Sequence, residues 1–304
     1  MKNRLQSRAF NFAIIPPKPV PRFMINGQSV CTPGNITTLI AQSKSGKSSL
    51  QEAMIAAVIS ADLGTSEQTD CLGFTAMGPK GKHVVHFDTE QSIYDHDMLI
   101  RRALRRAQAD VCPPWLHSYC LTGFAIPECR RLVRLVLDDL ATQGGTFAFL
   151  IDGVADLAVN VNDPEECNPL VAELHEAAIL FDCSIICNIH ENPGQDFGKG
   201  RGHLGSQLER KAESNLRLKK TGDIITVFSE KMRRGSIMEK DGPKFSWNNE
   251  AMMHLSCESV MSEKDQAKRD RTRDCVEDAF HHTKSERLRF AELLKAISAV
   301  ASVG

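Results

Sequence analysis

The chain has 304 residues, of which 42% are hydrophobic and 25% are charged. This composition is typical of a globular protein and excludes disorder for most of the chain. The 37 lysines and arginines almost balance the 38 aspartates and glutamates, so the net charge of -1 excludes a whole-protein electrostatic attraction to nucleic acid or membranes. Any basic binding surface must therefore be local.

The ten cysteines contain no C-x-x-C pair, and the first residues lack the continuous apolar core of a signal peptide. No apolar stretch approaches the roughly 20 residues of a membrane-spanning helix. We therefore expect reduced thiols, no membrane insertion and a cytoplasmic location.

Residues 1–34 are predicted to form an N-terminal Pro-rich arm and a lead-in to the first strand. The arm reads IIPPKPVPRF over Ile14–Phe23, and its prolines favour an extended polyproline II conformation. Such an arm is expected to run over a surface or onto a neighbouring subunit, and the alternative is a plain linker.

Residues 35–257 alternate between apolar runs with strand character and segments with helical periodicity, which predicts βαβ units in a mostly parallel sheet flanked by helices. The loop or hairpin Gly64–Lys82 interrupts this alternation. Antiparallel strands are predicted at one edge, and residues 258–304 are predicted to be a linker and a small helical C-terminal piece. The predicted strands are Ile36–Ile40, His83–Phe87, Leu116–Leu121, Phe147–Ile151, Ser184–Ile189, Ile224–Ser229, Ser236–Glu239 and Lys244–Trp247, and the predicted helices are Ser48–Leu63, one capped by Ser92 and running through Ala109, one with Pro127 in its first turn and running through Ala141, Pro164–Phe181, Cys275–His282 and Ser285–Ala301.

The strongest motif joins the strand Ile36–Ile40 to the helix Ser48–Leu63 and reads AQSKSGKS. A loop in this position points backbone N–H groups into a concavity at a positive helix end, where the phosphates of a nucleotide bind. Lys47 would reach the β- and γ-phosphates, and the Ser48 hydroxyl would bind Mg²⁺. The first glycine usual in such loops is replaced by Ala41. The candidate nucleotide-binding residues are Ala41, Gln42, Ser43, Lys44, Ser45, Gly46, Lys47, Ser48 and Ser49, and the alternative is a chance Gly-Lys-Ser turn.

Acidic residues follow two of the other predicted strands. Asp152 ends the run FAFLID, at the sheet edge where open α/β sheets bind their ligands, and is the second candidate to hold Mg²⁺. In the run HVVHFDTEQ, Glu90 comes just after a strand and is the candidate to orient and deprotonate an attacking water. The alternatives are a buried strand that happens to end in Asp, and a solvated acidic loop.

A glycine-rich stretch, Ile189–Gly205, follows the strand Ser184–Ile189 and is predicted to be a mobile loop. His190 at its start is a candidate sensor of the γ-phosphate. Lys199 and Arg201 are candidates to contact DNA or a neighbour's nucleotide, and a plain surface loop is the alternative.

The chain carries, in this order, AQSKSGKS, HFDTEQ, FLIDG, RGHLGSQLERKAES and EKMRRG. This series resembles the RecA-like ATPases of plasmids, phages and mobile elements, and it is most similar to the RepA-type hexameric replicative helicases and their AAA-labelled relatives. The resemblance covers approximately Arg22–Leu255. It implies a RecA-like P-loop NTPase core that forms a ring, often a hexamer, with ATP and Mg²⁺ bound between subunits.

The resemblance also implies roles for single residues. Lys231 and Arg233 resemble a Lys-x-Arg pair that reaches across the interface to a neighbour's γ-phosphate, where an arginine stabilises charge in the transition state. Arg201 and Arg210 are rival candidates for this arginine. The remaining implied roles are phosphate and metal binding for Lys47 and Ser48, the catalytic carboxylate for Glu90, the Walker B acid for Asp152 and the sensor for His190.

We therefore expect an ATP-hydrolysing motor that moves on single-stranded DNA during replication or mobilisation of an element. The alternatives are a nucleotide-binding regulatory or assembly ATPase with slow hydrolysis, and a small-molecule kinase, for which no acceptor-site signature is present. The segment ERLRFAELLKAISAVASVG resembles the first helices of a truncated winged-helix module.

Overall fold

The structure is a computed structural model that describes residues 9–192 and 198–257 and the single positions 276, 280, 283, 287 and 293. The chain divides into two compact units, Met1–Cys257 and Glu258–Gly304. Both predicted C-terminal helices, Cys275–His282 and Ser285–Ala301, lie almost wholly outside the described residues, as do the predicted linker and winged-helix resemblance. The fold below is that of the first unit.

A nine-stranded sheet forms the centre of this unit, in the order β12-β11-β10-β9-β3-β8-β7-β5-β6. The six strands from β9 to β6 are parallel to one another, whereas β10 is antiparallel to β9, and β11 and β12 continue the sheet by antiparallel pairing. The strands are β3 (Asn35–Ala41), β5 (His83–Asp88), β6 (Leu116–Cys120), β7 (Thr146–Asp152), β8 (Ser184–His190), β9 (Ser214–Thr221), β10 (Ile224–Met232), β11 (Lys244–Asn248) and β12 (Met253–Ser256).

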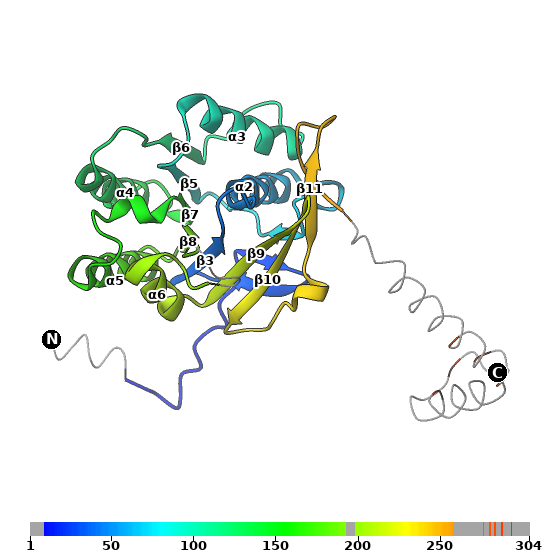
Figure 1. The fold of residues 1–304 in the computed structure, drawn as a ribbon. Helices are drawn as coiled ribbons and strands as arrows, with labels where there is room; N and C mark the ends of the chain where they lie inside the picture. The colour runs from blue at the N-terminus through cyan, green and yellow to red at the C-terminus, as the bar shows by residue number, and fades with distance from the viewer. Residues whose placement is uncertain are drawn as a thin grey trace. The chain divides into compact units, whose positions relative to one another are not determined.

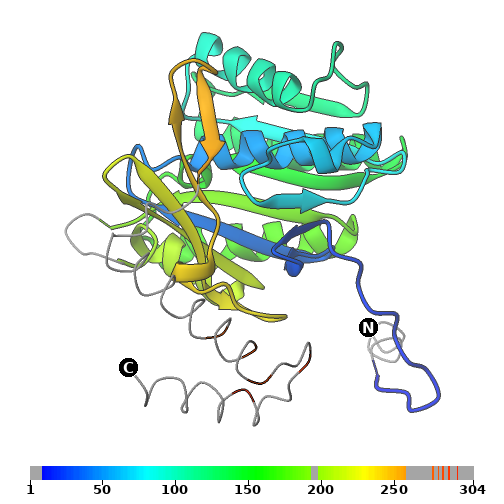
Figure 2. The same cartoon turned by 90° about the vertical axis from the view of Figure 1, so that its right-hand side faces the viewer.

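Helices cover both faces of the sheet (Figures 1 and 2), with α2 and α3 on one face and α4, α5 and α6 on the other. None of the described helices is long and apolar enough to cross a membrane. The α-helices are α2 (Lys47–Leu63), α3 (Ile93–Arg106), α4 (Ile126–Ala141), α5 (Pro164–Leu180) and α6 (Gly202–Lys211), and the short 3-10 helices are η1 (Ser66–Gln68), η2 (Val154–Leu157) and η3 (Glu239–Asp241).

The two faces have separate cores because side chains alternate along each strand. In β7, Leu150 packs with α2 and α3, whereas the next residue, Ile151, packs with α4 and α5. Every residue of β7 is buried, as expected for a central parallel strand. The predicted fold class, a mostly parallel sheet flanked by helices with an antiparallel edge, is confirmed for the described residues.

Several helix ends agree with their sequence signals. The Ser92 side chain accepts a hydrogen bond from the backbone N–H of Asp95 at the start of α3, and Gly64 caps α2 in a left-handed conformation. The prediction that the α3 helix continues to Ala109 is wrong. It ends at Arg106, and Gln108 adopts a positive φ of 55° that is incompatible with a helix.

A second, three-stranded sheet has the order β2-β1-β4 and was not predicted. Its strands are β1 (Phe23–Ile25), β2 (Gln28–Cys31) and β4 (Phe74–Ala76). Phe23 and Phe74 pack into the core beside α2, and the Phe23 ring meets the Phe147 ring edge to face. The described part of the arm before Arg22 has no regular secondary structure.

The predicted strand Ser236–Glu239 is wrong, because this segment makes no ladder pairs and its last residue is the first residue of η3. The prediction that the glycine-rich stretch Ile189–Gly205 is a loop is wrong for its last four residues, because α6 begins at Gly202. A Cβ atom on Gly205 would overlap the backbone of Gly200. These glycines therefore permit close backbone packing.

Candidate nucleotide-binding site

The predicted phosphate loop connects β3 to α2 at the carboxyl edge of the parallel strands. Ala41 is the last residue of β3 and pairs in register with His190 of β8. Ala41 is absent from the residues with positive φ, so alanine occupies the usual glycine position in extended backbone without strain. Gln42 and Lys44 are exposed, and Lys44 adopts a left-handed φ of 58°.

Gly46 is required by both conformation and space. Its φ is 81°, and a Cβ atom there would lie 2.9 Å from Ile225 Cδ1 and 3.0 Å from Phe245 Cε2. The antiparallel edge of the sheet therefore packs directly against the loop. Beside it, the hydroxyl of Ser49 lies 2.9 Å from His254 Nδ1, so Ser49 already has a partner within the chain.

Lys47, His190 and Glu90 form a continuous chain of polar contacts. The Lys47 ammonium lies 3.0 Å from His190 Nδ1, and it also reaches the carbonyl oxygens of Ala41 and Gln42 at 3.4 and 3.2 Å. His190 Nε2 lies 3.4 Å from Glu90 Oε1. An ammonium group only donates hydrogen bonds, so Nδ1 accepts and Nε2 carries the proton directed at Glu90. The sheet thus brings three of the predicted catalytic residues together.

The pKa values of Lys47 and Glu90 are both lowered, for different reasons. Burial lowers the pKa of Lys47, and the carboxylates of Glu90, Asp152 and Glu191 act against that shift. The hydrogen bond from His190 is the main cause that lowers the pKa of Glu90, helped by the positive charge of Lys47. Glu90 is therefore a carboxylate at neutral pH.

Asp152 is fully buried at the carboxyl end of β7. Its Oδ1 accepts a 2.8 Å hydrogen bond from Asn188 Nδ2, whereas Oδ2 has no hydrogen-bond partner among the described residues. Burial raises the pKa of Asp152 to about 6, although Ser48 and Asn188 both favour the charged form. A buried oxygen without a partner beside the Ser48 hydroxyl fits a hydrated Mg²⁺, which takes one or two protein oxygens and completes its shell with phosphate and water.

The backbone that carries Glu90 is fixed by Asp88. Asp88 Oδ1 accepts hydrogen bonds from the backbone N–H groups of Glu90 and Gln91, at 3.1 and 3.0 Å. Its other oxygen, Oδ2, lies 3.2 Å from His96 Nδ1 on α3. Asp88 also pairs in register with Asp152, so both acids stand at one edge of the sheet.

This network continues through Ser118 to a second histidine. Ser118 Oγ lies 3.1 Å from His96 Nε2 and 2.9 Å from His86 Nδ1, and the two imidazoles stack with 5.5 Å between centroids. Burial lowers the pKa of His86 to about 4, so His86 is neutral. The network therefore connects Asp88 to a buried, neutral imidazole.

Lys199 and Arg201 are exposed and lie near the carboxyl end of β8. The backbone N–H of Arg201 donates a 2.7 Å hydrogen bond to the His190 carbonyl. The buried Arg217 contacts the backbone next to Lys199, because it donates to the Gly198 carbonyl. Arg217 also binds Glu230 through two nitrogens at 2.8 and 2.6 Å and contacts Glu191. Both basic side chains therefore project from an anchored backbone.

Lys231 and Arg233 are not brought to the loop. Lys231 Nζ donates to the carbonyl oxygens of Glu209, Arg210 and Ala212 at the end of α6. Met232 pairs with Ser214 at the start of β9, the sheet edge opposite the phosphate loop, and Arg233 follows it. A contact of Arg233 with a nucleotide therefore requires a second copy of the chain. Arg210 is exposed on α6 and donates to Gln207.

Asn188, His96 and Arg217 were not singled out from the sequence. Asn188 interrupts the apolar run SIICNI, and Arg217 interrupts the buried run of β9. A polar residue in a fully buried strand requires a partner, so this interruption was the available signal. His96 gave no comparable signal, because it lies in a polar helix.

The described part of the chain is a mixed α/β unit with a mostly parallel sheet flanked by helices, an antiparallel edge, and the loop between β3 and α2 at the carboxyl end of the parallel strands. No model of a known protein family matches the sequence, and no curated protein matches it. Among solved structures, the chain is similar to one described as an ATPase domain, with 14% identity, a TM-score of 0.49, and coverage of 74% of this chain and 85% of that chain. So distant a likeness does not indicate a function.

Proposed function

We propose that the chain binds Mg·ATP at Ala41–Ser49 and hydrolyses it. The observation that carries this proposal is the contact chain from Lys47 through His190 to Glu90, beside the buried Asp152. Bound Mg²⁺ would neutralise phosphate charge, and Ser48 and Asp152 are the residues that would hold it. The phosphate group would replace His190 as the partner of the Lys47 ammonium.

Glu90 is the group that would position the attacking water. Its low pKa makes it a carboxylate that accepts a hydrogen bond from water but retains a proton poorly. Positioning and electrostatic stabilisation provide most of the rate acceleration in phosphoryl transfer, so this role needs no strong base. His190 holds the Glu90 carboxylate by the Nε2–H bond, and its Nδ1 would lose the Lys47 ammonium as a donor when the γ-phosphate arrives.

The site chemistry is tested by two substitutions. Lys47→Ala should remove nucleotide binding and turnover together, whereas Glu90→Gln should retain ATP binding and reduce turnover by about 10²-fold or more. Binding is measured with a fluorescent ATP analogue and turnover by phosphate release. Unchanged turnover in Glu90→Gln would remove Glu90 from catalysis.

We also propose that the ATPase is a motor on single-stranded DNA, assembled as a ring in which Arg233 and Lys231 act on a neighbour's nucleotide. Exposed Lys199 and Arg201, anchored through Arg217, support the DNA contact, because phosphate contacts require positive charges on a fixed scaffold. Lys199→Ala with Arg201→Ala should abolish stimulation by single-stranded DNA. Unchanged stimulation would contradict this role.

Arg201 and Arg210 remain rivals of Arg233 as the arginine that acts across the interface. Mixing each Arg→Ala variant with Glu90→Gln chains distinguishes them, because a mixed ring restores active interfaces only if the arginine and Glu90 belong to different subunits. Recovery of turnover is expected for Arg233→Ala. Recovery of turnover with Arg201→Ala or Arg210→Ala, and not with Arg233→Ala, would show that Arg201 or Arg210 is the arginine that acts across the interface.

The second candidate function is a nucleotide-dependent regulatory or assembly protein with slow hydrolysis. The near-neutral charge and the presence of only 2 Trp and 2 Tyr residues favour it, because aromatic platforms for base stacking are scarce. Tight ATP binding with negligible turnover, with and without DNA, would select this candidate.

A further inference from the structure

The loop that carries Glu90 depends on one buried carboxylate. Asp88, the last residue of β5, has no exposed surface, and its Oδ1 accepts hydrogen bonds from the backbone N–H groups of both Glu90 and Gln91. A single oxygen keeps two successive N–H groups in place only while the plane of its carboxylate is fixed. Because bulk water does not reach Asp88, its other oxygen requires a partner from the protein.

His96 on α3 is that partner. Its Nδ1 lies 3.2 Å from Asp88 Oδ2, and its side chain is buried with the carboxylate. Burial acts to raise the pKa of Asp88, but the hydrogen bond from His96 leads the contacts that outweigh burial, so this pKa is lowered. An ionised carboxylate only accepts hydrogen bonds, so His96 Nδ1 is the donor. The first turn of α3 is thereby joined to the end of β5.

The far side of the His96 ring is held as well. Ser118 Oγ lies 3.1 Å from His96 Nε2 and 2.9 Å from Nδ1 of His86, which pairs in register with Ser118 across β5 and β6. These contacts are complete when His86 Nδ1–H donates to Ser118 Oγ and the Ser118 hydroxyl donates to His96 Nε2. The His96 ring therefore cannot turn without losing a hydrogen bond on each side.

We propose that His96 is a positioning residue for ATP hydrolysis, which holds the Glu90 carboxylate in place through Asp88 and the backbone N–H groups of Glu90 and Gln91. This inference rests on the proposed function and adds the group on α3 that fixes the position of Glu90. A displacement of about 1 Å at a reacting group can cost roughly 10²-fold in rate. The phosphate loop belongs to β3 and α2, so loss of the His96 bond should reduce turnover rather than ATP binding.

Two substitutions of equal polarity at position 96 test the proposal. The amide nitrogen of asparagine occupies about the place of Nδ1 and can still donate to Asp88, whereas that of glutamine occupies about the place of Nε2 and faces Ser118. His96→Gln should lower kcat by about 10- to 100-fold and leave the dissociation constant of ATP within about twofold, whereas His96→Asn should retain kcat within about threefold. Equal losses of kcat in the two variants would overturn the proposal.

Amide hydrogen exchange of the nucleotide-free chain tests the same bond without ATP. The N–H groups of Glu90 and Gln91 should exchange about tenfold faster in His96→Gln than in His96→Asn, because only asparagine keeps the Asp88 carboxylate fixed. Equal exchange in the two variants would overturn the inference, whether or not the chain hydrolyses ATP.

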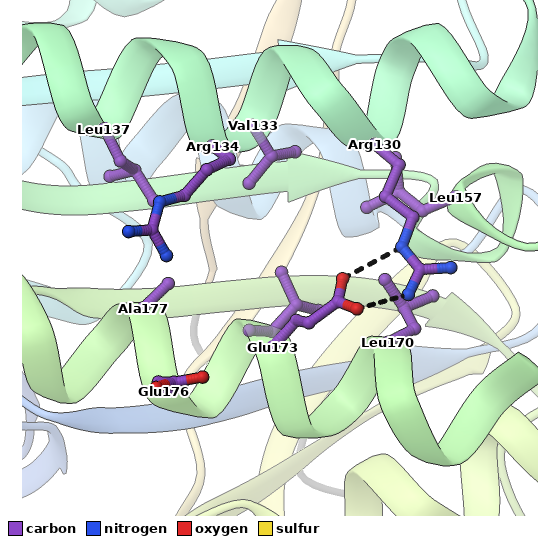
Figure 3. A pocket seen from close by; sticks show the side chains of 10 residues that line it. Arg130, Val133, Arg134, Leu137, Leu157, Leu170, Glu173, Glu176 and Ala177 are labelled. Carbon is purple, nitrogen blue, oxygen red and sulfur yellow. Dashed lines mark hydrogen bonds and ion pairs between the residues drawn. The ribbon is translucent and has the colours of Figure 1, made fainter.

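The opposite face of the sheet offers a control. Figure 3 shows Arg130 of α4 bonded to Glu173 of α5, at 2.9 and 2.6 Å, beside a cavity of about 190 Å³ between these helices. Glu173→Ala removes this polar contact between helices and should leave the exchange of the Glu90 and Gln91 amides unchanged. Faster exchange of these two amides in Glu173→Ala would overturn the inference, because it would show that they respond to any loosened helix.

The proposed function and this inference fail in different ways. A wild-type chain without turnover would contradict the hydrolysis of ATP, and the positioning role with it. Normal wild-type turnover with no difference between His96→Asn and His96→Gln would contradict the positioning role alone. If His96→Gln does not fold, Ser118→Ala takes its place, because it releases the Nε2 side of the ring, and unchanged kcat and exchange in that variant would overturn the inference.

Discussion

Lys47 Nζ and His190 Nδ1 lie 3.0 Å apart although 143 positions separate them in the sequence. The pairing of Ala41 with His190 across β3 and β8 creates this proximity, because it sets the end of β8 beside the start of the phosphate loop. Since Glu90 contacts the other nitrogen of His190, one imidazole orients both the cation and the carboxylate.

His190→Ala should therefore alter the pH dependence of turnover as well as its rate. The hydrogen bond from His190 is the main cause that lowers the pKa of Glu90, so its loss raises that pKa. The carboxylate then becomes protonated at a higher pH, and the acid limb of the kcat profile should move to higher pH while kcat falls about 10²-fold. A lower kcat with an unmoved acid limb would contradict the link between His190 and Glu90.

Gly46→Ala should destabilise the fold more than Gly64→Ala. Both glycines have a left-handed φ, of 81° and 74°, but a Cβ atom on Gly46 meets Ile225 and Phe245, whereas one on Gly64 meets nothing within 4 Å. The strain of a left-handed alanine, about 1 kcal/mol, is common to both, and overpacking adds about 1–3 kcal/mol at Gly46. Urea unfolding of the two variants measures the difference, and equal losses would show that the loop moves away from Phe245 freely.

Asp152→Asn should stabilise the nucleotide-free chain at neutral pH. The Asp152 carboxyl has a pKa of about 6 in the fold against 3.8 without burial, so the folded state holds more protons between these values and its stability falls as pH rises through that window. Two pKa units correspond to roughly 3 kcal/mol. Denaturation at pH 4 and pH 8 should show this fall in the wild type but a smaller one in the variant, with Asp110→Asn as an exposed control.

Equal pH dependence in the wild type and Asp152→Asn would show that Asp152 does not contribute this effect. His86 and His254, whose pKa values burial lowers to about 4, act in the opposite direction in both proteins. Their contribution therefore cancels in the comparison.

Arg217→Met should lower the free energy of unfolding by about 3–5 kcal/mol, because it leaves the largely buried carboxylates of Glu191 and Glu209 without their cation. Arg134→Met, which breaks an exposed pair with Asp138, should change it by no more than about 0.5 kcal/mol. Urea unfolding at pH 7 compares the two. Similar small losses would show that the carboxylates relax into solvent.

The parallel part of the sheet was predictable because its strands are apolar runs bounded by helical periodicity, as in Phe147–Ile151. The β9 strand was missed because its sequence, SNLRLKKT, places a charged residue at a buried position. That residue, Arg217, is acceptable only because distant glutamates bind it, and this compensation is tertiary. The α6 helix was missed for a related reason, since Gly202 and Gly205 serve close packing with residues that the local pattern does not identify.

The candidate site was predicted in part. Lys47, Ser48, Glu90, Asp152 and His190 all stand at one edge of the sheet, which follows from their positions at strand ends. The supporting residues Asn188 and His96 could not be assigned, because their role depends on which strand or loop they face. The opposite placement of Lys231 and Arg233 depends on the register of β9 and β10, which the sequence does not specify.

The most direct test is Mg²⁺-dependent ATP hydrolysis by the purified chain, measured with and without single-stranded DNA beside Lys47→Ala. The account predicts Mg²⁺-dependent turnover that DNA stimulates and that the Lys47→Ala variant lacks. ATP binding without turnover in either condition, or turnover that persists in Lys47→Ala, would contradict it.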